Sequence, residues 1–248
     1  MKSILEKFLI LIQFMTRIPI FFNIEYSEEK LGKGIKLLPL VGLLIGVILF
    51  FESFFLLKII ENKLIISILI VITELLVVGL IHIDGLADTF DGIFSYTEKE
   101  TMLKIMKDSR IGTNGAVILI LYFLSKTILL SEIIVIDIRY LIIFPIVSRL
   151  STSINAAFGT YARDKGMSNL IIEKNNKIDG IYYIILNLIL VFFIMYIKGV
   201  IVLLIGLIFI FLFRMLIYKK LDGITGDTMG ASLELTSIVI LIVGVILK

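Results

Sequence analysis

Long, uninterrupted apolar runs constrain this chain more than any other feature of its sequence. Seven runs are each about long enough to cross a bilayer core, which takes roughly 20 helical residues. They cover residues 35–57, 64–81, 113–131, 139–158, 180–197, 199–218 and 231–247, and a tight turn at Lys198–Gly199 must join the fifth to the sixth. Membrane-spanning β-strands would alternate apolar and polar residues, which these runs do not do. With 59% hydrophobic residues, the sequence predicts an all-α, polytopic transmembrane helix bundle of about seven spans.

The first 18 residues are also apolar, but their polar side chains share one side of a helix. Lys2, Glu6, Gln13 and Arg17 fall within about 60° on a helical wheel. A cleavable signal peptide is the alternative, although no A-x-A-like site follows the apolar stretch. We therefore expect an N-terminal amphipathic helix and loop over residues 1–34 and a transmembrane catalytic domain over residues 35–248.

The distribution of basic residues predicts the orientation in the membrane. Sixteen Lys and Arg residues precede the first run or lie in the loops after the second, fourth and sixth runs, whereas five lie on the alternate side. Because cytoplasmic loops carry the excess of positive charge, we expect a cytoplasmic N-terminus, an external C-terminus and a multi-pass protein of the cytoplasmic membrane. The lipid bilayer is then a partner. A net charge of +3 is too small to suggest nucleic acid, and a homo-oligomer is left open.

The densest group of acids follows the second run, in the stretch H-I-D-G-L-A-D-T-F-D-G at residues 82–92. Asp84, Asp88 and Asp91 are spaced to share one helical face, and mutually repelling carboxylates are typical ligands of Mg²⁺. A solvated acidic helix end is the alternative, but acids at the C-terminal end of a span would oppose the helix dipole. His82, the one histidine of the chain, is a candidate general base, a hydrogen-bond donor to phosphate or simply an interfacial residue.

The next loop predicts a phosphate site. Thr97–Glu100 has the pattern of a capping box, which would begin a short helix whose lysines suit the membrane surface. That helix leads to D-S-R-I-G-T-N-G at residues 108–115, where a glycine-rich turn enters the third run and presents N–H groups to an anion. Arg110 offers a bidentate fork for phosphate and Asp108 a metal ligand. The alternative is a capped turn held by an Asp108–Arg110 pair.

Charges inside the spans are costly and point to function or to internal pairing. Glu74 lies in the second run and Arg149 in the fourth, and the two could pair with each other or contact substrate. The fourth run also carries a polar stripe that suits a bundle interior or a cavity, made of Ser148, Thr152, Ser153 and Asn155.

Two further polar segments belong to the same predicted side of the membrane. Residues 161–166, Y-A-R-D-K-G, contain Arg163, and residues 222–234 contain Asp227 and Glu234 in a second glycine-rich turn that leads into a span. A second acidic patch facing the first would form a cradle for a diphosphate and its metal ions.

The motifs HIDGLADTFDG, DSRIGTNG, YARDKG and GDTMGASLE, in this order, resemble those of the cobalamin synthase family, the adenosylcobinamide-GDP ribazoletransferases. The resemblance covers nearly the whole chain. It implies a Mg²⁺-dependent enzyme of late cobalamin biosynthesis that joins GDP-activated adenosylcobinamide to α-ribazole, or to α-ribazole 5′-phosphate, and releases GMP.

Together, these patterns and the resemblance predict a site on the cytoplasmic face. Catalysis is assigned to Asp84, Asp88, Asp91 and His82, and Mg²⁺ to Asp84, Asp88, Asp91, Asp108 and Asp227. Substrate and phosphate binding are assigned to Asp108, Ser109, Arg110, Gly112, Arg149, Arg163, Asp227 and Glu234.

Rival interpretations remain at this stage. A CDP-alcohol phosphotransferase shares the D-x-x-D-G stretch at residues 88–92, but Gly112 stands where a further aspartate is expected. A membrane prenyltransferase also uses acidic helix ends. A cation or cobalt transporter would place its acids near mid-bilayer, whereas only Glu74 is clearly deep in a run.

Overall fold

The computed structural model describes residues 2–164 and 166–248, which form helices and one isolated β-bridge between Tyr161 and Ile224. In chain order the elements are α1 (Lys2–Met15), α2 (Glu28–Gly34), the 3₁₀ turn η1 (Ile35–Leu37), α3 (Leu38–Leu56), α4 (Lys63–Val78), α5 (Ile81–Ile93), α6 (Lys99–Ile105), α7 (Thr113–Ile136), α8 (Tyr140–Phe158), α9 (Met167–Glu173), α10 (Lys177–Leu221) and α11 (Gly226–Ile246). The predicted all-α bundle is confirmed.

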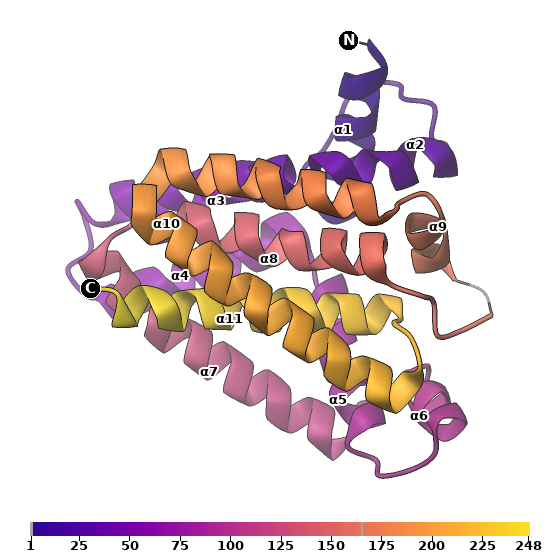
Figure 1. Ribbon diagram of the computed structural model, residues 1–248. Helices are drawn as coiled ribbons and strands as arrows, with labels where there is room; N and C mark the ends of the chain where they lie inside the picture. Colours follow the sequence, from indigo (N-terminus) through magenta and orange to yellow (C-terminus); the bar gives the residue numbers. More distant parts are fainter. Residues whose placement is uncertain (1, 165) are drawn as a thin grey trace.

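Five helical segments of the described chain are long and apolar enough to cross a membrane: 28–56, α7, α8, α10 and α11. α4 and α5 taken together form a sixth segment that is long and apolar enough, although their axes are bent by 96° relative to each other. α10 has 45 residues and is broken at Met195 and Tyr196, whose backbone angles are not helical. Figure 1 shows that α10 reverses direction there. All seven apolar runs therefore lie in these helices, and the tight turn falls slightly before the predicted Lys198–Gly199.

α8 is the central helix of the bundle and lies between α3 and α10 on one side and α11 on the other (Figure 1). Its polar stripe is buried, as predicted, and 89% of the residues in its most apolar 18-residue stretch are buried inside the protein. α3 comes very close to α8 through Gly42 and Gly46, where an added Cβ would lie 2.5 Å from the Pro145 carbonyl and 2.6 Å from the Ile142 Cα. Small residues at four-residue spacing allow this backbone approach within a membrane.

The outward faces of the bundle are apolar. In the most apolar 18-residue stretches of α7 and α10, only 28% of the residues are buried. Large side chains such as Leu124, Phe193 and Leu212 are more than half exposed. A water-soluble protein rarely exposes so continuous an apolar surface. The chain is therefore a multi-pass membrane protein with its lipid-facing residues on α7 and α10.

α1 confirms the expected amphipathic helix at the N-terminus. It lies roughly perpendicular to the long helices near one end of the bundle (Figure 1). Its axis is therefore roughly parallel to the membrane plane that those helices would cross. Ile10, Leu11 and Met15 are buried against the protein, whereas Ile4 and Leu5 on the other side are about 60% exposed. The helix therefore packs on the bundle and presents a second apolar edge to its surroundings.

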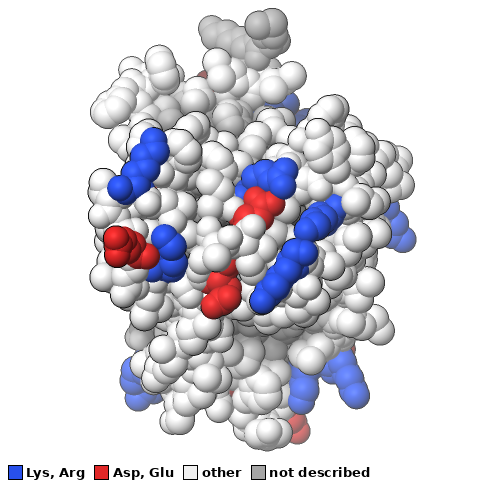
Figure 2. Space-filling model, turned by 90° about the vertical axis from the view of Figure 1, so that its left-hand side faces the viewer, with Lys and Arg blue, Asp and Glu red and all other residues white. Residues whose placement is uncertain are grey.

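The two ends of the bundle differ in construction. The α3–α4 and α7–α8 connections, the break in α10 and the C-terminus lie at one end, whose surface carries scattered charges among uncharged residues (Figure 2). α5, α6 and α9 gather at the opposite end with the first turns of α7 and α11 (Figure 1). Every loop in which the sequence predicts site residues lies at that second end.

Candidate functional site

The acidic motif lies on a helix of its own. Gly79 ends α4 with φ of +82°, a left-handed conformation that favours glycine, and α5 then starts in a new direction. Asp84 therefore lies in the first turn of α5, where the positive end of the helix dipole favours an acid. The prediction that the acids lie at the C-terminal end of a helix is wrong for Asp84, because a bend was not foreseen in the polar stretch after the second run, whereas Asp91 does lie in the last turn of α5.

α5 packs closely on the start of α11. An added Cβ on Gly85 would lie 2.9 Å from the Cα of Asp227, and one on Gly230 would lie 3.1 Å from the Cα of His82. Side chains larger than hydrogen at these two positions would force the helices apart. The contact brings the acids of α5 next to Asp227, as expected for two facing acidic patches.

Asp91 joins α5 to the beginning of α7. Its Oδ2 accepts a hydrogen bond from the Gly112 N–H at 2.7 Å, and its Oδ1 accepts one from the Gly115 N–H at 2.8 Å. These N–H groups belong to the glycine-rich turn that was predicted to bind a phosphate. In this structure the anion at the N-terminus of α7 is the protein's own carboxylate, which holds two parts of the site together.

A cavity of about 440 Å³ lies between α5 and the loop from α6 to α7. It brings together six of the polar or charged residues of these two segments: Asp84, Asp88, Lys107, Asp108, Ser109 and Arg110. Leu80, Ile83, Ala87, Met106, Ile111 and Leu119 complete its lining. We call this space the acidic cavity.

Arg110 and Asp108 pair at the rim of the acidic cavity. The Arg110 guanidinium donates through Nε to Oδ1 at 3.0 Å and through Nη2 to Oδ2 at 2.7 Å, and its backbone N–H also donates to Oδ1. These hydrogen bonds lower the pKa of Asp108 to about 2, so it is ionised at any physiological pH. The predicted alternative pair is thus formed, yet the Arg110 side chain is 87% exposed and keeps donor capacity for a ligand.

Arg163 approaches the acids from the opposite direction. The bridge between Tyr161 and Ile224, with backbone bonds of 2.9 Å on both sides, fixes the α8–α9 loop beside the loop before α11. Arg163 Nη2 then donates to Asp227 Oδ2 at 2.7 Å. The sequence predicted both residues as binding residues, but it gave no sign of the bridge that brings them together.

Negative charge is concentrated around Asp88. Asp84, Asp227 and Asp91 all act on it as neighbouring like charges, and Arg163 is the opposing cation. Carboxylates of this kind match the oxygen ligands that Mg²⁺ prefers. Among residues 2–164 and 166–248, however, no three Asp, Glu or His side chains are close enough to form a preassembled metal-binding group. The donor chemistry fits the ion, while the side chains are not arranged as a closed cage.

His82 lies on the other side of α5 from the acidic cavity. It is buried and lines a smaller cavity of about 160 Å³ with Asp227, Thr152 and residues of α1 and α9. Its Nδ1 has no hydrogen-bond partner within the described part of the chain. The structure therefore separates His82 from Asp84 and Asp88, with which the sequence grouped it.

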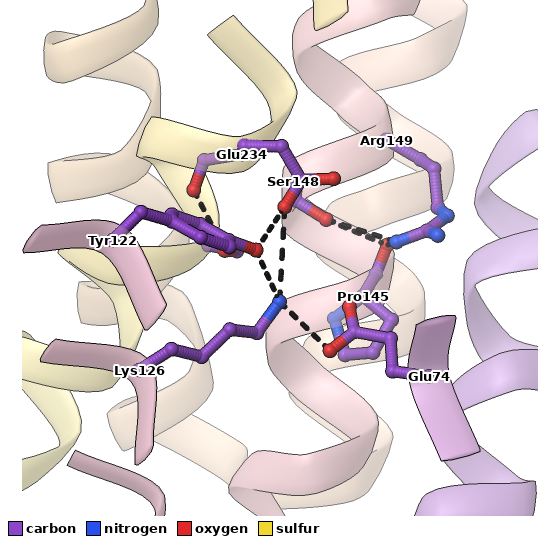
Figure 3. Close-up of polar contacts among 8 residues, drawn as sticks. Glu74, Tyr122, Lys126, Pro145, Ser148, Arg149 and Glu234 are labelled. Atoms are coloured by element: carbon purple, nitrogen blue, oxygen red, sulfur yellow. Dashed lines mark hydrogen bonds and ion pairs between the residues drawn. The ribbon is translucent and has the colours of Figure 1, made fainter. Parts of the chain in front are cut away.

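A second polar group lies deep in the bundle (Figure 3). Lys126 on α7 forms an ion pair with Glu74 Oε2 at 2.7 Å and donates a hydrogen bond to the Tyr122 hydroxyl at 2.6 Å, and its Nζ lies 3.7 Å from Glu234 Oε2. Tyr122 also donates to Glu234. Lys126 is 2% exposed. A lysine in the middle of an apolar run was the available signal, and the sequence interpretation overlooked it.

Arg149 is also part of this deep region and is 1% exposed. It donates to Ser148 Oγ at 3.2 Å and to the Pro145 carbonyl at 3.4 Å (Figure 3). Glu74 pairs with Lys126, so the suggested Glu74–Arg149 ion pair is not formed among the described residues. Neither Arg149 nor Glu234 lines the acidic cavity, and their predicted contact with substrate has no support in this geometry.

The predicted capping box at Thr97–Glu100 is wrong. α6 begins after Glu98, which makes no side-chain capping bond, and the Thr97 hydroxyl instead contacts Ser95 Oγ at 2.7 Å. A capping box does occur at the start of α11, where Thr225 and Thr228 cap each other's backbone. This cap orients the first turn of α11 and thereby Asp227.

Comparisons with known proteins identify the same family that the motifs resemble. The sequence profile of a family described as cobalamin-5-phosphate synthase matches residues 7–245. A protein of Fusobacterium nucleatum named adenosylcobinamide-GDP ribazoletransferase is 41% identical over 95% of both chains. Proteins of the same name from Clostridium novyi and Clostridioides difficile are 37% and 38% identical over 96% of each chain. No solved structure matches the chain.

Proposed function

The chain belongs to the cobalamin-5-phosphate synthase family, and we propose that it is an adenosylcobinamide-GDP ribazoletransferase. A ribose hydroxyl of α-ribazole, or of its 5′-phosphate, attacks the phosphorus that carries the cobinamide. The bond from that phosphorus to the bridging oxygen breaks, GMP leaves, and the hydroxyl proton passes to a base. The products are adenosylcobalamin, or its 5′-phosphate, and GMP.

One structural observation supports this proposal above the others. Asp84 and Asp88 on α5 and Asp108 and Arg110 on the α6–α7 loop face one cavity. These residues come from two separate motifs of the family resemblance, and the fold brings them together. Acids and a cation around one space are what the transfer of a phosphate-linked group requires.

Mg²⁺ is the proposed cofactor. Asp84, Asp88 and Asp108 would hold it from the acidic cavity, with Asp227 across the α5–α11 contact and with any lone pairs that Asp91 leaves available. When bound, the ion neutralises charge that develops on the phosphates as GMP departs.

The protein's own residues bind and orient the reactants. Arg110, which is largely exposed at the cavity rim, holds diphosphate oxygens through its planar fork. Arg163 balances the charge of Asp227 and keeps that acid oriented toward α5. We assign proton removal to a carboxylate of the acidic cavity, because His82 lines the separate cavity behind α5.

The active site is proposed to face the cytoplasm. The site loops all lie at the end of the bundle where the sequence places its excess of Lys and Arg.

The test is a reconstitution of the reaction. Purified protein in detergent would be incubated with GDP-activated adenosylcobinamide, α-ribazole and Mg²⁺, and the products identified by mass. Formation of adenosylcobalamin and GMP in equal amounts is expected. Hydrolysis to GMP without a joined product would contradict the proposal.

A further inference from the structure

The small cavity on the far side of α5 from the acidic cavity has no role in the reaction described above. It has a volume of about 160 Å³ and lies where α1, α5, α8, α9 and α11 meet. We call it the His82 cavity. Its walls are mainly apolar, and their large apolar side chains are Phe14, Met15, Ile81, Ile171 and Met229. An engineered apolar cavity of about 150 Å³ takes up benzene, so a space of this size can receive a small aromatic group.

Three polar side chains of the His82 cavity have hydrogen-bonding capacity that the protein does not use. His82 is 9% exposed, and its Nδ1 is closed off without a partner. Its Nε2 is not closed off in this way and makes no hydrogen bond within residues 2–164 and 166–248. The hydroxyls of Thr152 on α8 and Ser168 on α9 are likewise neither closed off nor hydrogen-bonded within those residues. These three atoms are therefore available to a molecule in the cavity.

The charge and polarity of the His82 cavity favour a neutral ligand with polar atoms. Asp227 is the one carboxylate in its described lining, which includes no Lys or Arg, so a phosphate or another anion would be repelled. Arg163 already donates to Asp227 Oδ2 at 2.7 Å, which offsets the charge of that acid. A hydrocarbon ligand such as an acyl chain would leave the free polar atoms without partners, which is costly for buried groups.

We infer that the His82 cavity binds a neutral, nitrogen-containing aromatic ring. The faces of such a ring are apolar and suit the methionine and phenylalanine side chains of the walls, which make favourable contacts with aromatic groups. Nitrogen and oxygen atoms at the ring edge would pair with His82, Thr152 and Ser168. Small-molecule sites have this composition, in which a few polar groups on mainly apolar walls fix the orientation of the ligand. Water is the alternative occupant, and about five molecules would fill the volume.

Both reactants of the proposed function carry a ring of this chemistry, so the two sources of the ring rest on that proposal. α-Ribazole has a benzimidazole base, and the GDP group has guanine. Asp227 lines the His82 cavity and also acts as a neighbouring like charge on Asp88 of the acidic cavity. A ring in the His82 cavity therefore lies close to the acids of the proposed active site.

The experiment measures binding rather than turnover. Calorimetry gives the Kd of α-ribazole and of guanosine, two uncharged nucleosides, for purified wild type, Thr152→Val, Ser168→Leu and Asn169→Leu in detergent. Thr152→Val keeps the shape of the side chain and removes its hydroxyl. Ser168→Leu fills part of the cavity, because Ser168 Oγ faces Gly226, where an added Cβ would lie 2.8 Å from it. Asn169 is the matched control, since it follows Ser168 on α9 and lines neither cavity.

For one of the two nucleosides, Thr152→Val should raise Kd about threefold to tenfold, as for one lost hydrogen bond, and Ser168→Leu should raise it at least about tenfold by overpacking the cavity. Asn169→Leu should keep the wild-type Kd. An effect on α-ribazole assigns the cavity to the acceptor base, and an effect on guanosine assigns it to guanine; either result supports the inference.

Equal binding of both nucleosides by wild type and Thr152→Val, or no binding by wild type, would overturn the inference and leave the cavity to water. Thr152→Val decides the matter even where Ser168→Leu fails to fold, because it changes no packing volume. Failure to form a joined product in the reconstituted reaction would refute the proposed function and leave the binding result intact.

Discussion

Two aspartates that are alike in the sequence should respond in opposite ways to the same substitution. Asp91 accepts two backbone hydrogen bonds at the start of α7, at 2.7 and 2.8 Å, whereas Asp88 lines the acidic cavity among like charges. Replacing either by Asn keeps the shape and removes one negative charge. For Asp91→Asn the new amide NH₂ must also face one of the two N–H donors.

The size of the effect at Asp91 follows from these contacts. A donor left without its acceptor costs about 1–3 kcal/mol, and losing an anion beside a helix N-terminus costs about 0.3–1 kcal/mol. The Gly112 N–H is at an exposed position where water can replace part of the bond, so we expect a loss of about 1–3 kcal/mol in total. At Asp88 the substitution relieves repulsion, and stability without Mg²⁺ should stay equal or rise slightly.

The assay is thermal unfolding of wild type, Asp88→Asn and Asp91→Asn in detergent, with and without Mg²⁺. Asp91→Asn should melt lower than wild type without the ion, by about 2–4 °C for each kcal/mol. Mg²⁺ should stabilise wild type more than Asp88→Asn, because ligand binding to the folded state raises its stability. If Asp91→Asn melts like wild type, the assigned role of Asp91 is wrong. If Mg²⁺ stabilises wild type and Asp88→Asn equally, the metal site is elsewhere.

Three further outcomes are expected. Arg110→Lys keeps the charge but loses the planar fork of the guanidinium. KM for the GDP-activated substrate should therefore rise about tenfold, the effect of losing one charged hydrogen bond, while the melting curve stays unaltered. Unchanged kinetics would leave Arg110 a purely structural role. Lys126→Met leaves buried acids unpaired and should destabilise the protein by about 3–5 kcal/mol, measured by unfolding in detergent, and an unchanged melting temperature would contradict that account. The chain has no cysteine, so single-cysteine variants report on the orientation in the membrane. Lys177→Cys should react with an impermeant thiol reagent only from the cytoplasmic side, and Glu132→Cys only from outside. The opposite pattern would show that the protein has the reverse orientation in the membrane.

The spans could be predicted because each depends on a local property. An apolar run of about the right length must cover its backbone polar groups with helix in lipid, and all seven runs lie in helices of the structure. The polar stripe of α8 was predicted to be internal for the same reason, and it is buried. These conclusions need no knowledge of which helices are neighbours.

Features that depend on contacts between distant segments were not predictable. The bend after Gly79 reorients the acidic motif, and nothing in the local sequence gave its angle of 96°. The bonds from Asp91 join residues 21 and 24 positions apart. Pairing of Glu74 with Lys126 rather than Arg149 depends on α4 and α7 being neighbours in the bundle. The motifs predicted candidate site residues on α5 and the α6–α7 loop, while the contacts of these residues became visible only in the fold.

The most direct test of the account compares transfer rates for wild type, Asp88→Asn and Glu132→Gln. Glu132 is an exposed acid near the end of α7 that lies away from the acidic cavity, so it controls for the loss of one negative charge. With GDP-activated adenosylcobinamide, α-ribazole and Mg²⁺, wild type and Glu132→Gln should form adenosylcobalamin and GMP at similar rates. Asp88→Asn should be slower by about 10²-fold or more, as when a group that stabilises transition-state charge is removed, while remaining folded. Wild-type rates for Asp88→Asn, or equal losses in both variants, would contradict the assignment of catalysis to the acidic cavity.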